Sequence, residues 1–457
     1  MSLKYDKIHS TDLMTKSEQE GAFLYSKEYM KFLKECKTEW ECAEYFENLL
    51  KENGFVNIEE VTNLKKGDKV YFLNKEKSLY AAVIGEEELK NGVLMVGAHI
   101  DSPRLDLKPM PLKEEFSIAL LKTQYYGGIK KYQWLSIPLA MHGIIYNKKG
   151  EKIKIVAGED DDFCFCIADL LPHLAREQMQ MKASEFIDAE KMNVMCGSMP
   201  DNEVKSDKVK YAILKILNEK YGIDELDFAR AEIEIVPAFD PKYIGFDKSL
   251  IGAYGQDDRI CAYATIRALL SSTDKQKTKI ALIVDKEEIG SVGTTSMQSQ
   301  TFDMFIKDII KYLGQDTCLE RVYYNSKMLS ADVASAADNS SAEVVDAQNS
   351  NVAGFGIALE KYSGSGGKYD ASDASARYMS EVMNVFESEK VAYQIGTLCK
   401  VDKGGGGTIA YILANKGVDV VDCGTAIISM HSPFEIASVN DTYMTYKAYK
   451  AFYDKMR

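Results

Sequence analysis

The stretch that decides the fold reads Val93-Leu94-Met95-Val96-Gly97-Ala98-His99-Ile100-Asp101. A short, continuous apolar run such as residues 93–98 is typical of a strand buried on both faces of a parallel sheet. Two further runs of this kind, residues 280–284 and 418–421, are separated from their neighbours by segments with a helical pattern. This alternation of strands and helices predicts an α/β domain.

A different pattern fills residues 107–245, between the first and second of these strands. Polar and apolar residues alternate there, for example over residues 231–235, and Pro and Gly interrupt the segment, with one helical stretch near residues 205–221. Two-residue alternation is typical of strands with one buried face. We therefore predict a β-rich domain inserted into an α/β domain formed by residues 1–106 and 246–457.

The composition excludes several classes of protein. The 457 residues contain 56 basic and 69 acidic side chains, which gives a formal net charge of −13. An acidic chain without a local basic stripe repels phosphate backbones and anionic lipids, so neither nucleic acid nor a membrane is an expected partner. No run of about 18 uncharged apolar residues occurs. The nine cysteines lie mostly in apolar periodic segments, as in reduced cytoplasmic proteins.

Side chains able to bind a metal follow each predicted strand. In open α/β sheets, the carboxyl ends of the strands share one edge, where ligands bind. A further acidic pair opens the helix that begins near residue 256. The residues that we expect at this edge are His99, Asp101, Asp257, Asp258, Asp285, Glu287, Glu288, Asp332 and His431.

Together these residues match the requirements of a two-metal hydrolase. Such a site needs a bridging carboxylate, further histidine or carboxylate ligands, and a separate base. Neighbouring side chains in an extended segment point to opposite sides, so one of Glu287 and Glu288 can ligate while the other faces the attacking water. Each feature alone has an ordinary alternative: a loop pair at His99, a solvated turn at Glu287, or a helix N-cap at Asp257. The hypothesis depends on the set.

The sequence resembles the M18 metallo-aminopeptidases, the aspartyl-aminopeptidase-like group, over nearly its whole length. The motifs that carry the resemblance lie at residues 97–103 (GAHIDSP), 169–175 (DLLPHLA), 251–259 (IGAYGQDDR), 285–291 (DKEEIGS), 330–332 (SAD), 404–409 (GGGGTI) and 430–432 (MHS). The resemblance implies a phosphorylase/hydrolase-like α/β/α catalytic domain interrupted by a β-rich, butterfly-like domain. In this family the inserted domain helps to build a homododecamer.

The resemblance also implies a role for each residue of the predicted site. The implied metal ligands are His99 and Asp332 for one ion, Glu288 and His431 for the other, and Asp257 between both. Glu287 would be the general base, and Asp101 would orient the ring of His99. The implied cofactors are two divalent ions per subunit, with Zn²⁺ expected and Mn²⁺ or Co²⁺ also suited to these ligands.

The implied activity is the release of N-terminal residues, preferentially Asp or Glu, from peptides. An acidic side chain would need a cationic partner, and Lys361 or Lys368 could supply it, although either lysine also suits a solvated surface position. His173, in the motif at residues 169–175, would reach the active site of a neighbouring subunit. His142 is not expected to bind a metal, because we find no carboxylate partner near it and expect it to end a strand.

One departure from the family leaves the substrate preference open. Relatives carry a His-Ala-Val-His-Pro-Asn-like run after the aspartate that matches Asp332, whereas here both histidines are absent around Ser335 and Asp338. A preference for basic or neutral N-terminal residues therefore stays an alternative. A catalytically idle, self-assembling peptide-binding shell is another, but such a shell has no need of two adjacent glutamates beside metal ligands.

Overall fold

The computed structural model of the protein describes residues 3–159 and 162–457, and the chain divides into two compact units. Unit 1 comprises Met1–Asp101, Pro241–Met430 and Phe434–Arg457, and unit 2 comprises Ser102–Asp240 and His431–Pro433. The predicted insertion, residues 107–245, begins and ends a few residues later than unit 2. The assignment of His431–Pro433 to unit 2 was not predicted.

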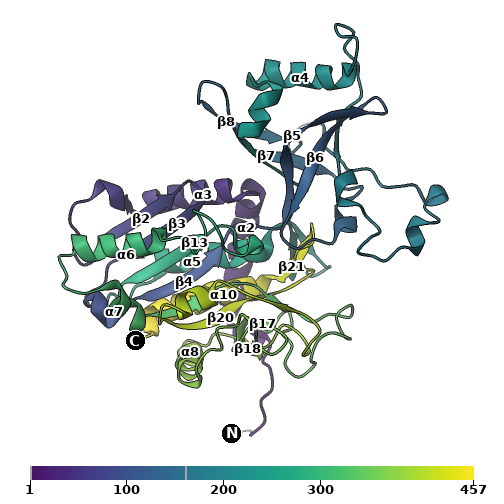
Figure 1. Cartoon of the computed structure of the whole chain (residues 1–457). Coiled ribbons are helices and arrows are strands. Elements are labelled where there is room, and N and C mark those ends of the chain that lie inside the picture. Colours follow the sequence, from purple (N-terminus) through teal and green to yellow (C-terminus); the bar gives the residue numbers. More distant parts are fainter. Residues whose placement is uncertain (1–2, 160–161) are drawn as a thin grey trace. The chain divides into compact units, whose positions relative to one another are not determined.

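Unit 1 is built on a 13-stranded mixed sheet with helices on both faces (Figure 1). Ten strands follow the order β1-β2-β3-β13-β4-β14-β20-β21-β12-β11. Of the other three, β15 and β16 pair with β20, and β18 pairs with β16. The strands are β1 Val56–Asn57, β2 Lys69–Asn74, β3 Ser78–Val83, β4 Leu94–His99, β11 Lys242–Ile244, β12 Leu250–Ala253, β13 Lys279–Val284, β14 Lys327–Ser330, β15 Ala334–Ser335, β16 Ile357–Glu360, β18 Tyr393–Gly396, β20 Asp419–Ile428 and β21 Glu435–Ser438.

The helices of unit 1 form the two outer layers. They are α1 Ser10–Leu13, α2 Lys16–Glu35, α3 Glu39–Glu52, α5 Gln256–Ser271, α6 Thr301–Tyr312, α7 Leu319–Tyr324, α8 Ala376–Ser388, α9 Ala410–Ala414 and α10 Val439–Lys455. A two-stranded ribbon, β17 Gly364–Ser365 with β19 Gly405–Gly406, lies outside the main sheet. Thr38 and Glu41 form a capping box at the start of α3.

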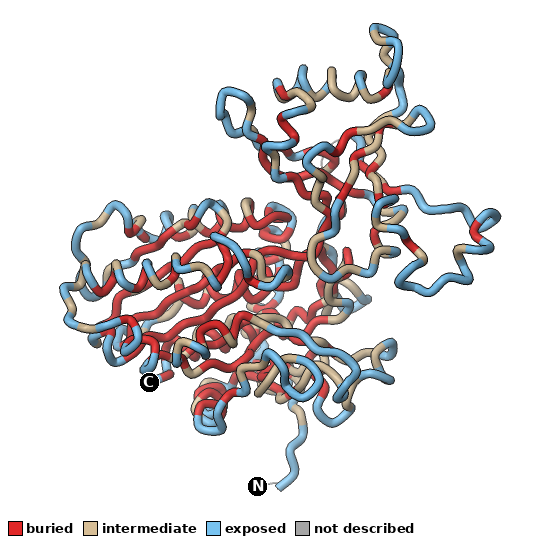
Figure 2. Tube along the Cα trace, viewed as in Figure 1, coloured by how far each residue is buried: buried red, intermediate tan, exposed pale blue. Residues whose placement is uncertain are grey.

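Two hydrophobic cores lie on opposite faces of the sheet. Leu94, Val96 and Ala98 of β4 belong to the core shared with α2, α3, α5, α8 and α10, whereas Met95 belongs to the core shared with α6, α7 and α9. Figure 2 shows the buried segments running through these strands. Because successive side chains point to opposite faces, an all-apolar strand supplies both cores. The predicted α/β/α architecture is confirmed.

The central strands align the ends that carry the predicted site. Strand β4 pairs in parallel with β13 and with β14, and β14 pairs in parallel with β20. Their carboxyl ends therefore lie at one edge of the sheet. One local expectation was wrong: Glu287 and Glu288 lie in a 3₁₀ turn, η8 Glu287–Ile289, and not in an extended segment.

Unit 2 contains a six-stranded antiparallel sheet in the order β8-β7-β10-β5-β6-β9. Helix α4 packs against β5, β6 and β9. The elements are β5 Arg104–Glu115, β6 Ile118–Tyr126, β7 Leu139–Tyr146, β8 Lys152–Ala157, β9 Val194–Gly197, α4 Lys208–Tyr221 and β10 Ala231–Pro237. The predicted strand near residues 231–235 and the helix near residues 205–221 are both present.

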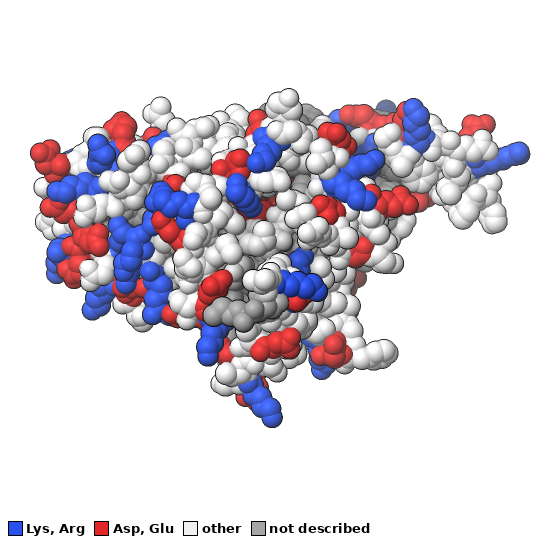
Figure 3. Space-filling model, turned by 90° about the horizontal axis from the view of Figure 1, so that it is seen from below, with Lys and Arg blue, Asp and Glu red and all other residues white. Residues whose placement is uncertain are grey.

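Charged side chains on the surface are mixed in sign. On the face shown in Figure 3, Lys and Arg side chains lie among Asp and Glu side chains, so neighbouring charges partly offset each other. Over residues 3–159 and 162–457, no helix combines the length and the apolarity that a bilayer span requires.

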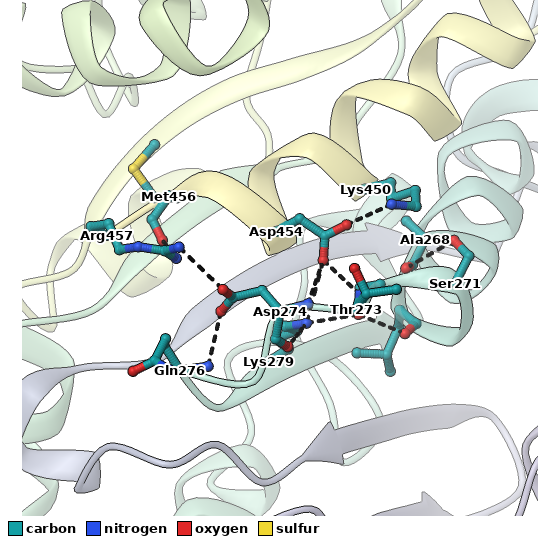
Figure 4. Close-up of polar contacts among 12 residues, drawn as sticks. Ala268, Ser271, Thr273, Asp274, Gln276, Lys279, Lys450, Asp454, Met456 and Arg457 are labelled. Carbon is teal, nitrogen blue, oxygen red and sulfur yellow. Dashed lines mark hydrogen bonds and ion pairs between the residues drawn. The ribbon is translucent and has the colours of Figure 1, made fainter. Parts of the chain in front are cut away.

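The C-terminal helix is fixed to the turn that precedes β13. Asp454 of α10 accepts hydrogen bonds from the amides of Thr273 (2.7 Å) and Asp274 (2.9 Å), and its Oδ1 lies 3.6 Å from Nζ of Lys279 (Figure 4). Lys279, the first residue of β13, is only 1% exposed. A buried ammonium group needs such a partner, because desolvation strongly disfavours an isolated charge.

We expect Asp454→Ala to lower the free energy of unfolding by about 3 kcal/mol, because it leaves Lys279 buried without its carboxylate. Urea unfolding followed by circular dichroism measures the loss. Lys450→Met is the matched control, since Lys450 bonds the same carboxylate at 2.6 Å but is 34% exposed and should contribute less than about 1 kcal/mol. Equal losses in the two variants would contradict this account.

Candidate metal centre

His99, the last residue of β4, stands at the centre of the predicted site. Its side chain is 2% exposed, and its Nδ1 lies 2.9 Å from the main-chain oxygen of Asp101 and 3.3 Å from Oδ1 of that residue. Because Nδ1 donates to Asp101, Nε2 is the nitrogen left for a metal. Nε2 lies 3.3 Å from Oδ1 of Asp257 and 3.7 Å from Oδ1 of Asp332.

Asp101 also holds the turn that carries the two glutamates. Its fully buried carboxylate accepts the amide of Glu287 at Oδ1 (3.1 Å) and the amide of Glu288 at Oδ2 (3.2 Å). The sequence predicted only a contact with His99. Asp101 therefore connects the ends of two neighbouring strands, β4 and β13, at the site.

Two overlapping groups of side chains could each hold a metal ion. The first consists of His99, Glu287 and Asp332, and the second of His99, Asp257 and Glu288. Within each group the candidate ligand atoms lie within 4.8 Å of one another. Imidazole nitrogens and carboxylate oxygens are the donors that zinc accepts in catalytic sites, so the residues fit that metal.

The electrostatics of the site favour a cation. Burial, and after it the charge of Asp332, raises the pKa of Glu287 to about 8. Burial, again with Asp332 nearby, raises the pKa of Asp258 well above its usual value. Burial lowers the pKa of His99, but its bonds to Asp101, Asp257 and Asp332 outweigh that effect and raise it well above the ordinary value. Carboxylates crowded together in this way repel each other unless a positive charge lies among them.

The family model described as "Aminopeptidase I zinc metalloprotease (M18)" matches residues 32–453 of the chain. The chain belongs to the M18 family. Its relatives include a protein of Clostridium acetobutylicum named "Probable M18 family aminopeptidase 1", 47% identical over 94% of this chain and 94% of that protein. A protein of the same name in Thermotoga maritima is 45% identical over 98% of this chain and 100% of that protein. The protein is thus an M18 aminopeptidase, a peptide hydrolase of a zinc metalloprotease family.

Solved structures of M18 proteins share this fold. The crystal structure of the M18 aminopeptidase from Thermotoga maritima matches with a TM-score of 0.95, at 43% identity, over 99% of this chain and 100% of that chain. Aminopeptidase I from Clostridium acetobutylicum matches with a TM-score of 0.93, at 44% identity, over 99% and 100%. The S. cerevisiae mApe1 dodecamer is similar in fold, with a TM-score of 0.75 at 21% identity over 94% and 96%.

His431, predicted as a ligand in this M18 protein, is part of unit 2. Its Nδ1 lies 2.8 Å from the main-chain oxygen of Gly128, which leaves Nε2 for another partner. Neither of the two ligand groups found among the described residues includes His431. Its role as a ligand stays a prediction.

The two lysines considered for substrate binding share one counter-ion. Nζ of Lys361 lies 3.0 Å from Oδ1 of Asp373, and Nζ of Lys368 lies 2.9 Å from Oδ2 of the same residue. Lys368 also lies over the ring of Tyr362, 4.0 Å from its centroid, and lines a cavity of about 180 Å³. Both lysines are about two-fifths exposed. Together with Asp373 they carry one net positive charge.

His173 lies in an exposed segment of unit 2. It is the middle residue of a single 3₁₀ turn, Pro172–Leu174, and is itself exposed. Around it, Leu170, Leu171 and Leu174 are 45%, 49% and 68% exposed. Exposed leucines grouped in this way are typical of a surface that another protein covers.

Some buried polar pairs could not be read from local sequence. His142 lies inside β7, not at its end, and its Nε2 is 3.3 Å from Oε1 of Glu159, so the expectation that it lacks a carboxylate partner was wrong. Glu360 is 8% exposed and lies opposite Asp422 in the pairing of β16 with β20. For Asp422 a signal existed, because a charged residue that directly follows the apolar run 418–421 and continues a buried strand requires buried polar partners.

We expect Glu360→Gln to stabilise the protein at high pH. Burial, and after it the charge of Asp422, raises the pKa of Glu360 to about 8, against about 4.3 in an unfolded chain. The folded protein favours the protonated carboxyl group of Glu360. The contribution of this group to the free energy of unfolding is therefore complete below about pH 4 and is lost as the pH rises towards 8. Glutamine stays neutral, and the variant should therefore gain stability over the wild type between pH 5 and 9.

Urea unfolding of EDTA-treated protein at several pH values measures this difference, at about 1.4 kcal/mol for each unit of pKa shift. Glu343→Gln, at an exposed glutamate, is the control and should show no such trend. A difference between Glu360→Gln and the wild type that stays constant with pH would exclude the buried ionisation.

Proposed function

We propose that this M18 protein is a two-metal aminopeptidase. The proposed ligands are His99 and Asp332 for one ion, Glu288 and His431 for the other, and Asp257 between them. The observation that carries the proposal is that the two overlapping ligand groups together contain four of these five residues, His99, Asp257, Glu288 and Asp332. Because Nε2 of His99 can bind only one ion, we place Glu288 on the second ion, together with His431. Zn²⁺ is the proposed metal, because the family is described as zinc metalloproteases and the donor set suits zinc.

We assign Glu287 as the general base. Two divalent ions in the site would polarise the scissile carbonyl and make a bound water more acidic. Glu287 then accepts the proton of the attacking water and delivers it to the leaving amine. Asp101 supports this role, since it fixes the main chain of Glu287 and the ring of His99 at once. The reaction releases the N-terminal residue of a peptide.

We propose acidic N-terminal residues as the preferred substrates. The net positive charge of Lys361, Lys368 and Asp373 supports this preference, because a carboxylate side chain could bind either ammonium group. The shared counter-ion and the absence of histidines around Ser335 and Asp338 favour the alternative, a basic or neutral preference.

We further propose that the chain assembles as a homododecamer in the cytoplasm. The yeast relative of the same fold is described as a dodecamer, and the exposed leucines around His173 suit contact with a second copy. In such an assembly His173 would approach the active site of a neighbouring subunit, and unit 2 would supply subunit contacts. The nine cysteines are free thiols, as expected in a reducing compartment.

We expect Glu287→Gln to abolish turnover while the protein keeps its metal ions. The amide cannot accept the proton of the attacking water, so kcat should fall by at least about 100-fold, a typical contribution of a general base. Peptide hydrolysis and metal content by mass spectrometry test this together. His99→Ala is the comparison variant, in which metal content should fall.

Retained activity in Glu287→Gln, or a loss of metal as large as in His99→Ala, would refute the role of Glu287. Absence of hydrolysis by the wild-type protein in the presence of bound ions would favour the idle shell.

The substrate preference can be tested with a series of aminoacyl p-nitroanilides. We expect kcat/KM to be highest for the Asp and Glu derivatives and to fall in Lys361→Met and Lys368→Met. Arg321→Met, which removes an exposed cation elsewhere in unit 1, is the control for net charge. Fast hydrolysis of Lys or Leu derivatives without hydrolysis of Asp or Glu derivatives would establish the alternative preference.

A further inference from the structure

Arg259 is a fully buried arginine that directly follows two acidic residues of the candidate site. It lies in the first turn of α5, after Asp257 and Asp258, and its exposed fraction is 0%. Long basic side chains are almost never fully buried unless their hydrogen-bonding groups are engaged. The contacts of Arg259 therefore indicate what the residue does.

The guanidinium group of Arg259 joins two main-chain segments that are far apart in the sequence. Its Nε donates to the main-chain oxygen of Ile100 at 3.3 Å, and its Nη2 donates to the main-chain oxygen of Lys37 at 2.8 Å. The guanidinium carbon lies 5.3 Å from the centroid of the Tyr254 ring, within the range of a cation–π interaction. Since these contacts involve separate atoms of one rigid plane, they fix its orientation.

Ile100 is the residue between His99 and Asp101. The amide of His99 donates to Oδ2 of Asp258 at 3.3 Å, while the carbonyl of Ile100 accepts from Arg259. Two consecutive residues of α5 thus hold the main chain on both sides of the His99–Ile100 peptide. The direction of the His99 side chain depends on this peptide and on the contacts of its ring with Asp101.

The other end of the contact lies in the corner between α2 and α3. The carboxylate of Glu41 accepts the amides of Lys37 (2.8 Å) and Thr38 (3.2 Å), which fixes the corner locally. The carbonyl of Lys37 is thereby aimed at Arg259. A defined corner gives the guanidinium group a fixed support outside the site.

We infer that Arg259 is a positioning residue, which uses the α2–α3 corner as a support to hold the carbonyl of Ile100 and thereby positions the ligand His99 and the residue that orients its ring, Asp101. This inference rests on the proposed two-metal site and extends it to a group that touches neither metal nor substrate. Outer contacts of this kind typically change metal affinity by about 10- to 100-fold when they are lost.

The test compares Arg259→Lys with the wild-type protein. Lysine keeps the charge but cannot reach both carbonyls from one planar group. We expect the dissociation constant for Zn²⁺, measured by competition with a chromophoric chelator, to rise by about 10- to 100-fold. We also expect the visible spectrum of the Co²⁺-loaded protein to change, because it reports the geometry of the ligands.

Arg267→Lys is the matched control on the same helix. Arg267 bonds Glu28 and the Tyr263 hydroxyl and is 35% exposed, so neither the Zn²⁺ affinity nor the Co²⁺ spectrum should change. A purely stabilising role for Arg259 would lower the melting temperature of the EDTA-treated protein and leave both metal measurements unchanged. That result would overturn the inference.

A second variant approaches the contact from its other end. Glu41→Ala removes the acceptor that fixes Lys37 and should weaken Zn²⁺ binding in the same direction, by less than Arg259→Lys. Glu18→Ala is its control, because Glu18 occupies the same position of the capping box at α2 without contacting this corner. If Arg259→Lys fails to fold, unchanged Zn²⁺ affinity in Glu41→Ala overturns the inference.

The two proposals fail in different ways. If the wild-type protein binds Zn²⁺ no better than His99→Ala, the proposed metal site is wrong, and the role of Arg259 falls with it. If the wild-type protein binds Zn²⁺ and Arg259→Lys matches it in affinity and Co²⁺ spectrum, only the positioning role is wrong.

Discussion

The candidate site depends on one buried carboxylate, that of Asp101. It accepts the amides of Glu287 and Glu288, while the main-chain oxygen of the same residue lies 2.9 Å from Nδ1 of His99. Hydrogen bonds to an ionised acceptor are about twice as strong as neutral ones, so they hold both amides in place. Parallel strands β4 and β13 bring their ends to one edge, and there Asp101 joins the main chain of both glutamates to the ring of His99, which links three candidate residues of the site. Loss of Asp101 would therefore disturb all three.

A site of this composition stores electrostatic repulsion until a cation binds. The pKa of Glu287 is raised to about 8, by burial and then by the charge of Asp332, which means that the folded chain disfavours its ionised form. Surface acids, as on the face in Figure 3, lie among basic groups and in water, where like charges interact weakly. The buried acids have neither advantage. The cluster of buried acids therefore lowers the free energy of unfolding relative to a neutral site, and the binding of a cation offsets this loss.

The sequence predicted the features that follow from local patterns. Apolar runs near residues 94–98 and 280–284 became β4 and β13, and the polar residues after them lie at one edge of the sheet. It did not predict contacts made by the main chain, because carbonyls and amides are the same in every residue. The bond from Arg259 to the carbonyl of Lys37 spans 222 residues and leaves no mark in composition or spacing. The partnership of His142 with Glu159 escaped for a related reason, since a strand and a loop bring the two together.

The backbone at the start of α5 explains how three adjacent residues, 257–259, contact three different groups of His99 and Ile100. In a regular helix, successive side chains are turned by about 100°, and one face would point at the site while the next turned away. Asp257 (φ −81°, ψ 108°) and Asp258 (φ −115°, ψ 29°) depart from helical geometry, and regular helix begins only after them. This irregular turn lets Asp257 face Nε2 of His99, Asp258 accept the amide of His99, and Arg259 reach the carbonyl of Ile100. The contacts of one short segment thus surround His99, the last residue of β4, and the rest of helix α5 packs on the same strand.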